Sequence, residues 1–290
     1  MLAPAPENSL DTLYMQKIFL AAASFAVLTL ATSANAQTGD WTGAYVGVAA
    51  GYADRAESSR ESVGFDTNLD GRFGDTVNTA AAANAFSPGF CGGRFNTNAA
   101  PGGCRKDDNN DVEISLRGGY DVQFGSFVLG GVIEYSRLEL QDSVTAFSVT
   151  PAAYTFTRKL DSMFAIRARG GYAMEDNLFY VTGGYAKGNM KHSFRTTNTV
   201  NAFPQSGGGD ADGYQLGLGY ERKLTPNWTL GAEFLRTSFD DEDYGVRATN
   251  NGTTAATNAF LLVNTGGTGF RRTDDDFEFN SYRVTASYRF

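Results

Sequence analysis

The chain has 290 residues and is rich in Gly (34), Phe (22) and Tyr (14) but poor in Pro (7), Met (5) and His (1). This composition favours pleated, aromatic-rich strands over packed helices. The formal net charge of -8 argues against a nucleic-acid partner, because nucleic-acid binding needs a basic surface that displaces counterions from phosphates. We therefore expect an all-β protein that does not bind nucleic acid.

Residues 15–36 have the layout of a signal peptide. Lys17 precedes the apolar run 18–30, and the small residues 34–36 follow it. The run is shorter than the roughly 20 residues that a transmembrane helix needs, so cleavage between Ala36 and Gln37 is favoured over a permanent membrane anchor. Residues 1–14 are acidic and contain proline, which indicates a misassigned start upstream of Met15.

From Trp41 onward, apolar and polar residues alternate in eight segments, the period-two pattern of strands with two different faces. Short turns separate some neighbouring segments, as at Gly125-Ser126, which favours antiparallel pairing. In chain order, the expected strands cover residues 41–53, 111–124, 127–140, about 164–172, 178–188, 214–224, 228–239 and 279–290.

The connections between these strands alternate in length. Short ones lie near residues 125, 175 and 226, and long ones cover about 54–110, 142–158, 195–211 and 241–274. Outer-membrane barrels have short periplasmic turns and long extracellular loops. No later stretch reaches 18 uninterrupted apolar residues, so a chain that spans a membrane must do so as a closed barrel.

The predicted fold is therefore an eight-stranded antiparallel transmembrane β-barrel, an up-and-down meander over residues 37–290 with four long extracellular loops. The same alternation also fits a soluble β-sandwich or a lipocalin-like barrel, in which the apolar face would point inward. Charges on the face opposite the aromatics, and aromatics at the strand ends, favour the membrane barrel.

The polar faces of the strands carry acidic and basic residues. Buried in a narrow lumen, such charges must pair, because an unpaired buried ion costs about several kcal/mol. They could instead line a diffusion path, but eight strands enclose an interior just wide enough for side chains. The candidate lumen charges are Glu113, Arg117, Glu134, Arg167, Arg169, Glu221, Glu233, Arg283 and Arg289.

Cys91 and Cys104 lie in a Gly/Asn-rich connection of an exported chain, which predicts a loop disulfide, with free thiols as the alternative. Two cysteines and one histidine cannot supply a structural zinc tetrahedron. Acidic clusters at 107–111, 240–243 and 274–276 offer oxygen ligands for divalent ions that bridge lipopolysaccharide phosphates, although solvated loop charge is the simpler interpretation. We expect no protein-bound metal or cofactor.

Sequence motifs of hydrolases, nucleotide-binding proteins and zinc proteases are absent. The single histidine, His192, could act as the base of a Ser/His/acid triad, but it lies near a strand end without a recognisable partner motif. The sequence therefore predicts a protein that is not an enzyme.

Four segments carry a family resemblance: WTGAYVGVAAGY, LFYVTGGYAKG, LGLGYERKLTPNWTLGAEFL and the terminal SYRVTASYRF. Over residues 41–290 the chain resembles the small porin-like outer-membrane proteins of the alphaproteobacterial 25- and 31-kilodalton surface-antigen group, within the opacity-protein and OmpA-type barrel superfamily. The resemblance implies that Tyr282, Tyr288 and Phe290 are read by the barrel-assembly machinery. The first long connection, with its cysteine pair, departs from the family pattern.

We therefore expect a structural protein of the Gram-negative outer membrane that contributes to envelope integrity and surface contact. Its expected partners are membrane lipid, lipopolysaccharide, the assembly machinery and unidentified host or envelope ligands. The alternatives are a narrow channel for ions or small solutes, and a binding or adhesion role of the loops.

Overall fold

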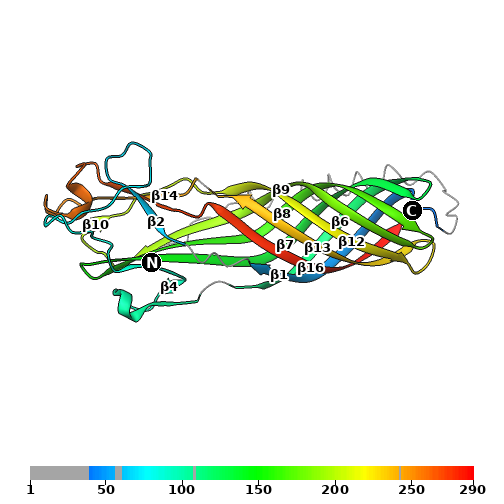
Figure 1. Ribbon diagram of the computed structural model, residues 1–290, viewed down its shortest axis with the longest axis horizontal. Helices are drawn as coiled ribbons and strands as arrows, with labels where there is room; N and C mark the ends of the chain where they lie inside the picture. The colour runs from blue at the N-terminus through cyan, green and yellow to red at the C-terminus, as the bar shows by residue number, and fades with distance from the viewer. Residues whose placement is uncertain (1–38, 56–60, 107–108, 242) are drawn as a thin grey trace, which may run out of the picture.

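A computed structural model of the chain describes residues 39–55, 61–106, 109–241 and 243–290. The expected signal peptide and the Ala36–Gln37 cleavage site lie outside the described residues. Eight antiparallel strands form a closed ring (Figure 1): β1 (Gly43–Arg55), β6 (Asp111–Phe124), β7 (Phe127–Ser148), β8 (Ala152–Met174), β9 (Asn177–Thr196), β12 (Asp210–Lys223), β13 (Trp228–Asp240) and β16 (Asp276–Arg289).

The ring closes because β1, the first strand, pairs with β16, the last. In that ladder Tyr45 lies opposite Arg289 and Tyr52 lies opposite Tyr282. Each strand pairs with its neighbour along the chain in the same up-and-down order, so no barrel strand is left with an unpaired edge. The predicted eight-stranded barrel is confirmed.

The outer surface of the barrel carries a wide apolar band near the short turns. Its side chains alternate with buried ones along every strand, and many are about half exposed. We call this surface the apolar band; its members include Val48, Ile114, Leu116, Leu129, Ile133, Ile166, Val181, Leu216, Leu218, Leu230 and Val284. The apolar face therefore points outward and the charged face inward, the reverse of a soluble barrel.

The short connections are two-residue turns at Gly125-Ser126 and Glu175-Asp176 and the segment 224–227. They lie together with Phe290 at one end of the molecule, the turn end, and the longer connections meet at the opposite end, the loop end (Figure 1). Among the described residues, no helix is long and apolar enough to cross a membrane.

One expected loop is absent: residues 142–158 are mostly strand. The β7–β8 hairpin continues to a three-residue turn at 149–151, and β9 runs to Thr196. The residues beyond the band are buried on both faces, so the apolar/polar alternation that identifies strands is lost there. Register shifts between Arg137 and Leu140 and between Leu160 and Ser162 mark where these strands leave the band.

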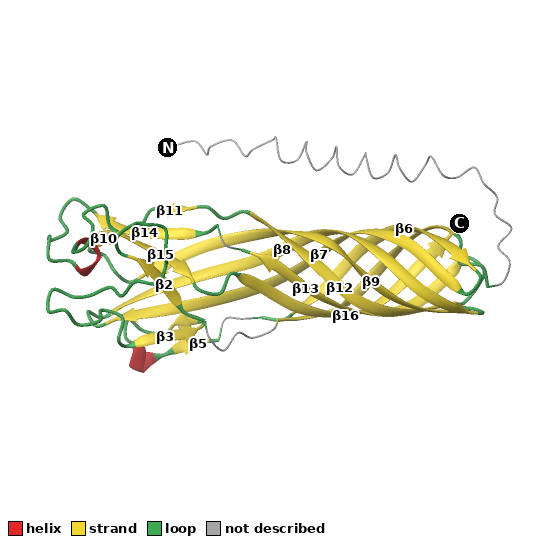
Figure 2. Cartoon of the chain, turned by 45° about the horizontal axis from the view of Figure 1, so that its top comes forward, coloured by secondary structure: helices red, strands yellow, loops and turns green. Residues whose placement is uncertain are grey.

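The remaining long connections are folded into a cap at the loop end (Figure 2). Most of their strands form a second sheet in the order β10-β14-β15-β2, with β11 also paired to β14. These strands are β2 (Val63–Asp66), β10 (Asn201–Ala202), β11 (Gln205–Ser206), β14 (Gly245–Asn250) and β15 (Thr268–Arg272). Two short 3₁₀ turns, η1 (Ala100–Gly102) and η2 (Ala259–Leu261), complete the described helical structure.

Candidate functional site

The interior of the molecule is filled in successive layers from the turn end to the cap. Strand β8 crosses all of them, with Ala173 in the first layer, Arg169 and Arg167 in the second, Met163 in the third, Arg158 in the fourth and Tyr154 in the fifth. Three of the layers are apolar and two are ionic. Each ionic layer therefore lies between two apolar layers.

An apolar plug closes the turn end. Trp41 is completely buried there, and its ring lies under the cationic heads of Lys223 and Arg289, at 5.0 and 4.8 Å from the centroid. The Arg289 Nη1 also donates to the Trp41 carbonyl at 2.8 Å. The plug consists of Trp41, Val128, Ala173, Leu178 and Tyr180.

The lower ionic layer lies within the apolar band and contains all nine candidate lumen charges. Each of them is at most 5 % exposed. A tenth member, Asp121, completes a set of five carboxylates and five arginines: Glu113, Asp121, Glu134, Glu221 and Glu233 with Arg117, Arg167, Arg169, Arg283 and Arg289. The formal charge of this layer is therefore balanced.

Arg283 is the centre of one half of the lower ionic layer. Its Nη1 lies 2.8 Å from Glu113 Oε1 and 2.6 Å from Glu134 Oε1, and its Nη2 contacts Glu233. Arg167 Nη2 lies 3.1 Å from the other oxygen of Glu134. One guanidinium thus joins carboxylates from three strands, β6, β7 and β13.

Asp121 is the centre of the other half. It accepts from Arg169 Nε at 2.7 Å and also contacts Arg289, while Arg169 Nη1 lies 2.8 Å from Glu221 Oε1. Asp121 lies on the polar face of its strand in the alternating sequence pattern, and this position is the signal that identifies it as a lumen charge. Arg117 connects the two halves, 3.8 Å from Glu221 and 3.6 Å from Glu233.

Tyr45 stacks in the lumen against the same arginines, 4.7 Å from Arg169 and 4.9 Å from Arg289. Its ring lies over Gly119, where an added Cβ would come within 2.4 Å of the ring. Glycine at this position therefore makes the space that the tyrosine occupies.

A second, upper ionic layer lies beyond the band and was missed by sequence reasoning. Asp142 is completely buried and contacts three arginines: Arg158 Nε at 2.8 Å, Arg272 Nη2 at 2.6 Å and Arg55 Nη2 at 2.8 Å. Glu61 joins the same group through Arg55 at 2.8 Å. Asp142 and Arg158 fall in a segment expected to be a loop, so no strand pattern indicated that they point inward.

Burial and the facing Asp142 carboxylate raise the pKa of Glu61 to about 7. Burial alone would also raise the pKa of Asp142, but Arg272, Arg158 and Arg55 together lower it to about 2. The pKa of Glu61 therefore lies above its ordinary value and the pKa of Asp142 lies below it. Of the two carboxyls, Glu61 is the one that gains a proton near neutral pH.

His192 belongs to this upper layer. Its Nε2 lies 2.7 Å from Asp241 Oδ1, and its ring stacks on Tyr244 with 4.8 Å between centroids. The side chain is 5 % exposed. Within the described part of the chain, no group of three or more His, Cys, Asp or Glu side chains is arranged to hold a metal ion.

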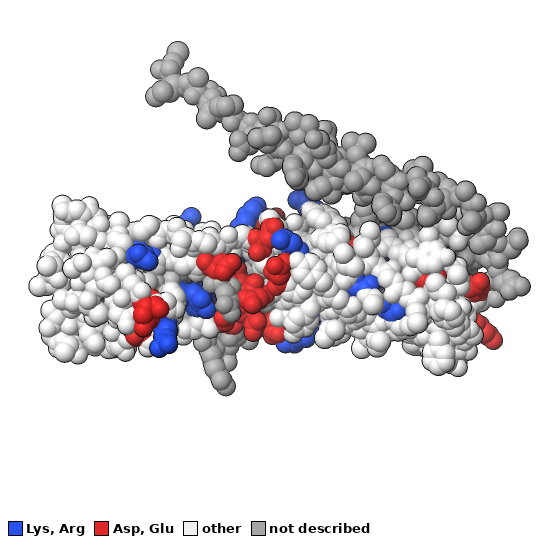
Figure 3. Space-filling view, turned by 90° about the horizontal axis from the view of Figure 1, so that it is seen from above, with Lys and Arg blue, Asp and Glu red and all other residues white. Residues whose placement is uncertain are grey.

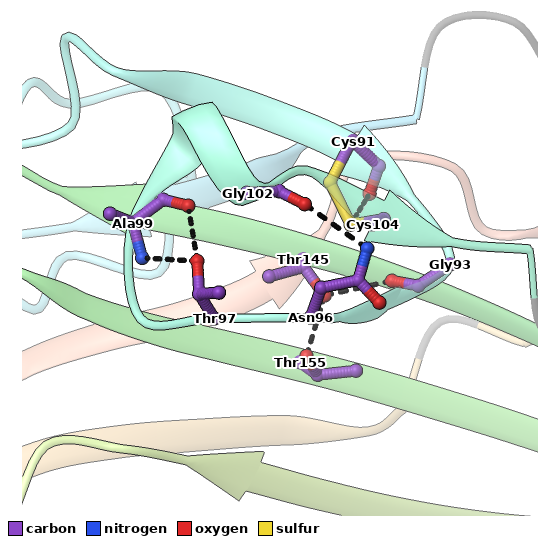
Figure 4. Close-up of a disulfide and its surroundings, with 9 residues drawn as sticks. All are labelled: Cys91, Gly93, Asn96, Thr97, Ala99, Gly102, Cys104, Thr145 and Thr155. Atoms are coloured by element: carbon purple, nitrogen blue, oxygen red, sulfur yellow. Dashed lines mark hydrogen bonds between the residues drawn. A yellow bond between two sulfur atoms is a disulfide. The ribbon is translucent and has the colours of Figure 1, made fainter.

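Cys91 and Cys104 form a disulfide with a Cα–Cα distance of 6.0 Å (Figure 4). It joins β3 (Gly89–Gly92), which pairs with β7, to β5 (Cys104–Arg105), which pairs with β4 (Arg94–Phe95). Thr145 Oγ1 on β7 donates to the Gly93 carbonyl at 2.8 Å. The disulfide thus ties a small hairpin to the outside of the β7–β8 extension.

Tyr282 lies on the outer face of β16, and 55 % of its surface is exposed. Phe290 follows the last residue of β16 and is 43 % exposed. Tyr288 makes edge-to-face contacts with Trp228 and Phe290, with centroid distances of 5.4 and 5.1 Å. All three side chains belong to the outward-facing set.

Residues 23–290 match the family model described as "Outer membrane protein beta-barrel domain". The chain is 26 % identical over 211 residues to the 31 kDa outer-membrane immunogenic proteins of Brucella melitensis biotype 1 and Brucella suis biovar 1, which covers 71 % of this chain and 74 % of each relative.

Solved outer-membrane structures also align with the chain at low similarity. The attachment invasion locus protein Ail of Yersinia pestis has 12 % identity and a TM-score of 0.34, covering 86 % of this chain and 99 % of its own. The outer membrane protease OmpT of Escherichia coli has 12 % identity and a TM-score of 0.39, covering 86 % and 97 %.

Proposed function

Because the chain belongs to the outer membrane protein beta-barrel domain family and lies in the Gram-negative outer membrane, we propose that it is a closed, non-enzymatic structural barrel. It anchors an ordered cap outside the membrane and contributes to envelope integrity and surface contact. The observation that carries this proposal is the layered interior, in which two ionic layers are separated and enclosed by three apolar ones.

The layers oppose the alternative of a narrow channel. A diffusing ion would have to pass the apolar plug at Trp41 and then a second apolar layer. This second layer includes the completely buried side chains of Leu140, Leu160, Phe239, Phe277 and Phe279. An ion in an apolar layer of this kind loses its hydration without gaining partners, which costs about several kcal/mol.

The absence of a catalytic role is supported by His192. The side chain is only 5 % exposed, with Nε2 held by Asp241 and the ring stacked on Tyr244, so little of the imidazole is accessible to a substrate. A general base must reach the proton that it abstracts.

The test is heat-modifiability together with planar-bilayer conductance of the purified full-length protein. We expect unboiled and boiled samples to migrate differently on a denaturing gel, and flat current traces after insertion. A general porin inserted into the same bilayer is the positive control for conductance. Discrete current steps from the folded protein would replace the proposal with the channel.

Contact with lipopolysaccharide is supported by the charges outside the band. On the face that Figure 3 shows, acidic and basic side chains gather between the apolar band and the cap, in a region that we call the charged belt. In this belt Lys159 pairs with Glu139 at 3.0 Å, and Lys187 lies 3.6 Å from Asp210. Exposed ammonium groups and carboxylates at the membrane surface suit phosphate headgroups and the divalent ions between them.

Recognition by the barrel-assembly machinery is supported by the outward aromatics of the last strand. We expect Phe290→Ala to lower the amount of heat-modifiable protein in the outer membrane, because Phe290 is exposed at the end of the chain. Phe90→Ala, which removes an exposed aromatic from the cap, is the control. Equal assembly of both variants would remove Phe290 from this role.

A further inference from the structure

The outer tip of the cap is uncharged. None of the residues 76–93, 143–157, 196–209 and 248–270 is Asp, Glu, Lys, Arg or His, in a chain whose composition is 19 % charged. Three of these segments come from the long connections and the fourth is the end of the β7–β8 hairpin, and the space-filling view shows this end free of charged side chains on the face it presents (Figure 3). Four separate segments of the sequence therefore form one uncharged surface at the tip of the cap.

The four segments meet at one pocket of about 340 Å³. All of its lining residues belong to them, so the pocket contains no charged group. Its size falls in the range of small-ligand sites, roughly 300–1,000 Å³. Because four segments close it, the pocket suits a compact group better than an extended chain.

Hydrogen bonds between the segments hold the pocket in shape. Asn198 Nδ2 donates to the Tyr154 hydroxyl at 2.9 Å, and Asn258 Nδ2 donates to Asn201 Oδ1 at 3.1 Å. The Val149 amide donates to the Ala85 carbonyl at 2.8 Å. Each bond joins two different segments of the chain, so the walls are positioned before any ligand arrives.

The groups left open to a ligand are hydroxyls and aliphatic side chains. The hydroxyls of Thr150, Thr199 and Thr257 are exposed and make no hydrogen bond to the described residues. Val149 and Val200 expose 44 % and 53 % of their surface beside them. The pocket therefore offers a ligand both hydrogen-bonding hydroxyls and apolar contacts.

We propose that this pocket binds the end of a neutral carbohydrate chain. Threonine hydroxyls both donate and accept, which matches the hydroxyls of a sugar, and the valines match its C–H faces. An anionic ligand would find no cation, and a cationic ligand would find no carboxylate. A purely apolar ligand would leave the three hydroxyls without partners, which costs about 1–3 kcal/mol for each buried group.

The test is a glycan array probed with the full-length protein folded in detergent micelles, followed by calorimetric titration with the best neutral oligosaccharide. We expect binding to uncharged oligosaccharides and weaker or absent binding to their sialylated and sulfated forms. Thr199→Val and Thr150→Val remove one hydroxyl each at nearly constant volume, and we expect each to weaken binding at least tenfold.

Thr265→Val is the matched control, because Thr265 is an exposed threonine of the same tip that does not line the pocket. Heat-modifiability of every variant verifies the barrel, so a failure of glycan binding is distinguishable from a failure of the structural proposal. The inference is overturned if folded wild-type protein binds no neutral oligosaccharide, if sulfated or sialylated glycans bind better, if an uncharged peptide competes equally, or if Thr265→Val weakens binding as much as Thr199→Val.

Discussion

Arg283 and Asp142 perform the same task in two different environments. Each is a single charged group that contacts several partners of opposite sign: Arg283 contacts three carboxylates in the lower ionic layer, and Asp142 contacts three arginines in the upper one. Both are completely enclosed, so the cost of burying the charge is offset only while all partners are in place. Replacing either group leaves several opposite charges buried.

Arg283→Ala is therefore expected to destabilise the barrel by about 3–5 kcal/mol, because Glu113, Glu134 and Glu233 lose their shared partner. Urea unfolding of the protein in lipid vesicles measures the change. Arg236→Ala is the control, since Arg236 forms an exposed pair with Glu278 that contributes at most about 1 kcal/mol. Similar losses in the two variants would contradict a special role of the buried arginine.

We expect the attachment of the cap to depend on pH through Glu61. Its pKa is raised to about 7, so the folded state binds a proton that the unfolded segment has released, and stability is lost as pH rises from about 4.5 through 7. The groups facing Glu61 are Asp142, Arg272 and Arg55. We expect hydrogen exchange of the β2 amides to show more frequent opening at pH 8 than at pH 5, beyond the intrinsic rate change.

Glu61→Gln should remove this additional pH dependence, because glutamine stays neutral throughout. Glu139→Gln is the matched control, since Glu139 is exposed and pairs with Lys159 in the charged belt. If β2 opens with the same pH dependence in Glu61→Gln as in the unmodified protein, another group controls the attachment.

The β7–β8 hairpin is the element that connects the membrane barrel to the cap. It carries the lower ionic layer at one end and the aromatic cap core at the other, where Tyr154 packs against Phe86 and Phe270 with centroids 5.4 and 5.7 Å away. Strand β3 pairs with the β7 strand of this hairpin, and the disulfide joins the small β4–β5 hairpin to β3. A rigid two-stranded support of this kind replaces the flexible loop that the sequence suggests.

Removing the disulfide should loosen this hairpin without opening the barrel. The bond closes a loop of 13 residues, and cross-links of that size contribute about 3 kcal/mol in the chain-entropy account. We expect Cys91→Ser/Cys104→Ser to be cleaved faster by protease within residues 89–106 in intact vesicles, with unchanged heat-modifiability. Unaltered cleavage would mean that the pairing of β3 with β7 is sufficient.

The whole molecule is divided along its axis by the solvent that surrounds each part. Lipid-facing residues form the apolar band, charged residues form the belt above it, and the uncharged tip lies farthest from the membrane (Figure 3). The two tryptophans both lie near the turn end, but Trp228 is 52 % exposed on the outer face and Trp41 is enclosed in the lumen. They therefore report on the two sides of the same barrel wall.

Brominated lipids should quench Trp228 and leave Trp41 unaffected, because only the Trp228 ring faces the bilayer. In vesicles containing such lipids, we expect fluorescence of Trp41→Phe to be strongly quenched and that of Trp228→Phe to be nearly unchanged. The reverse pattern, or equal quenching, would show that the apolar band is not the lipid-facing surface.

The sequence by itself determined the barrel and the composition of its lumen. Within the band, one face of each strand contacts lipid and the other face contacts a packed, charged lumen. Every strand therefore needs alternating apolar and polar residues, and this alternation can be recognised directly in the sequence. It identified the strands around Leu116, Ile166, Leu218 and Val284 and the charges between them, including the Arg283 network.

Only the tertiary structure decided the cap, the upper ionic layer and the pocket. Beyond the band, β7 and β8 are buried on both faces by segments distant in sequence, so their alternation disappears and Asp142 and Arg158 carry no local mark of burial. The uncharged stretches are visible in the sequence one at a time. Their convergence on one pocket depends on the closure of the barrel, which brings three long connections and the β7–β8 hairpin to the same end.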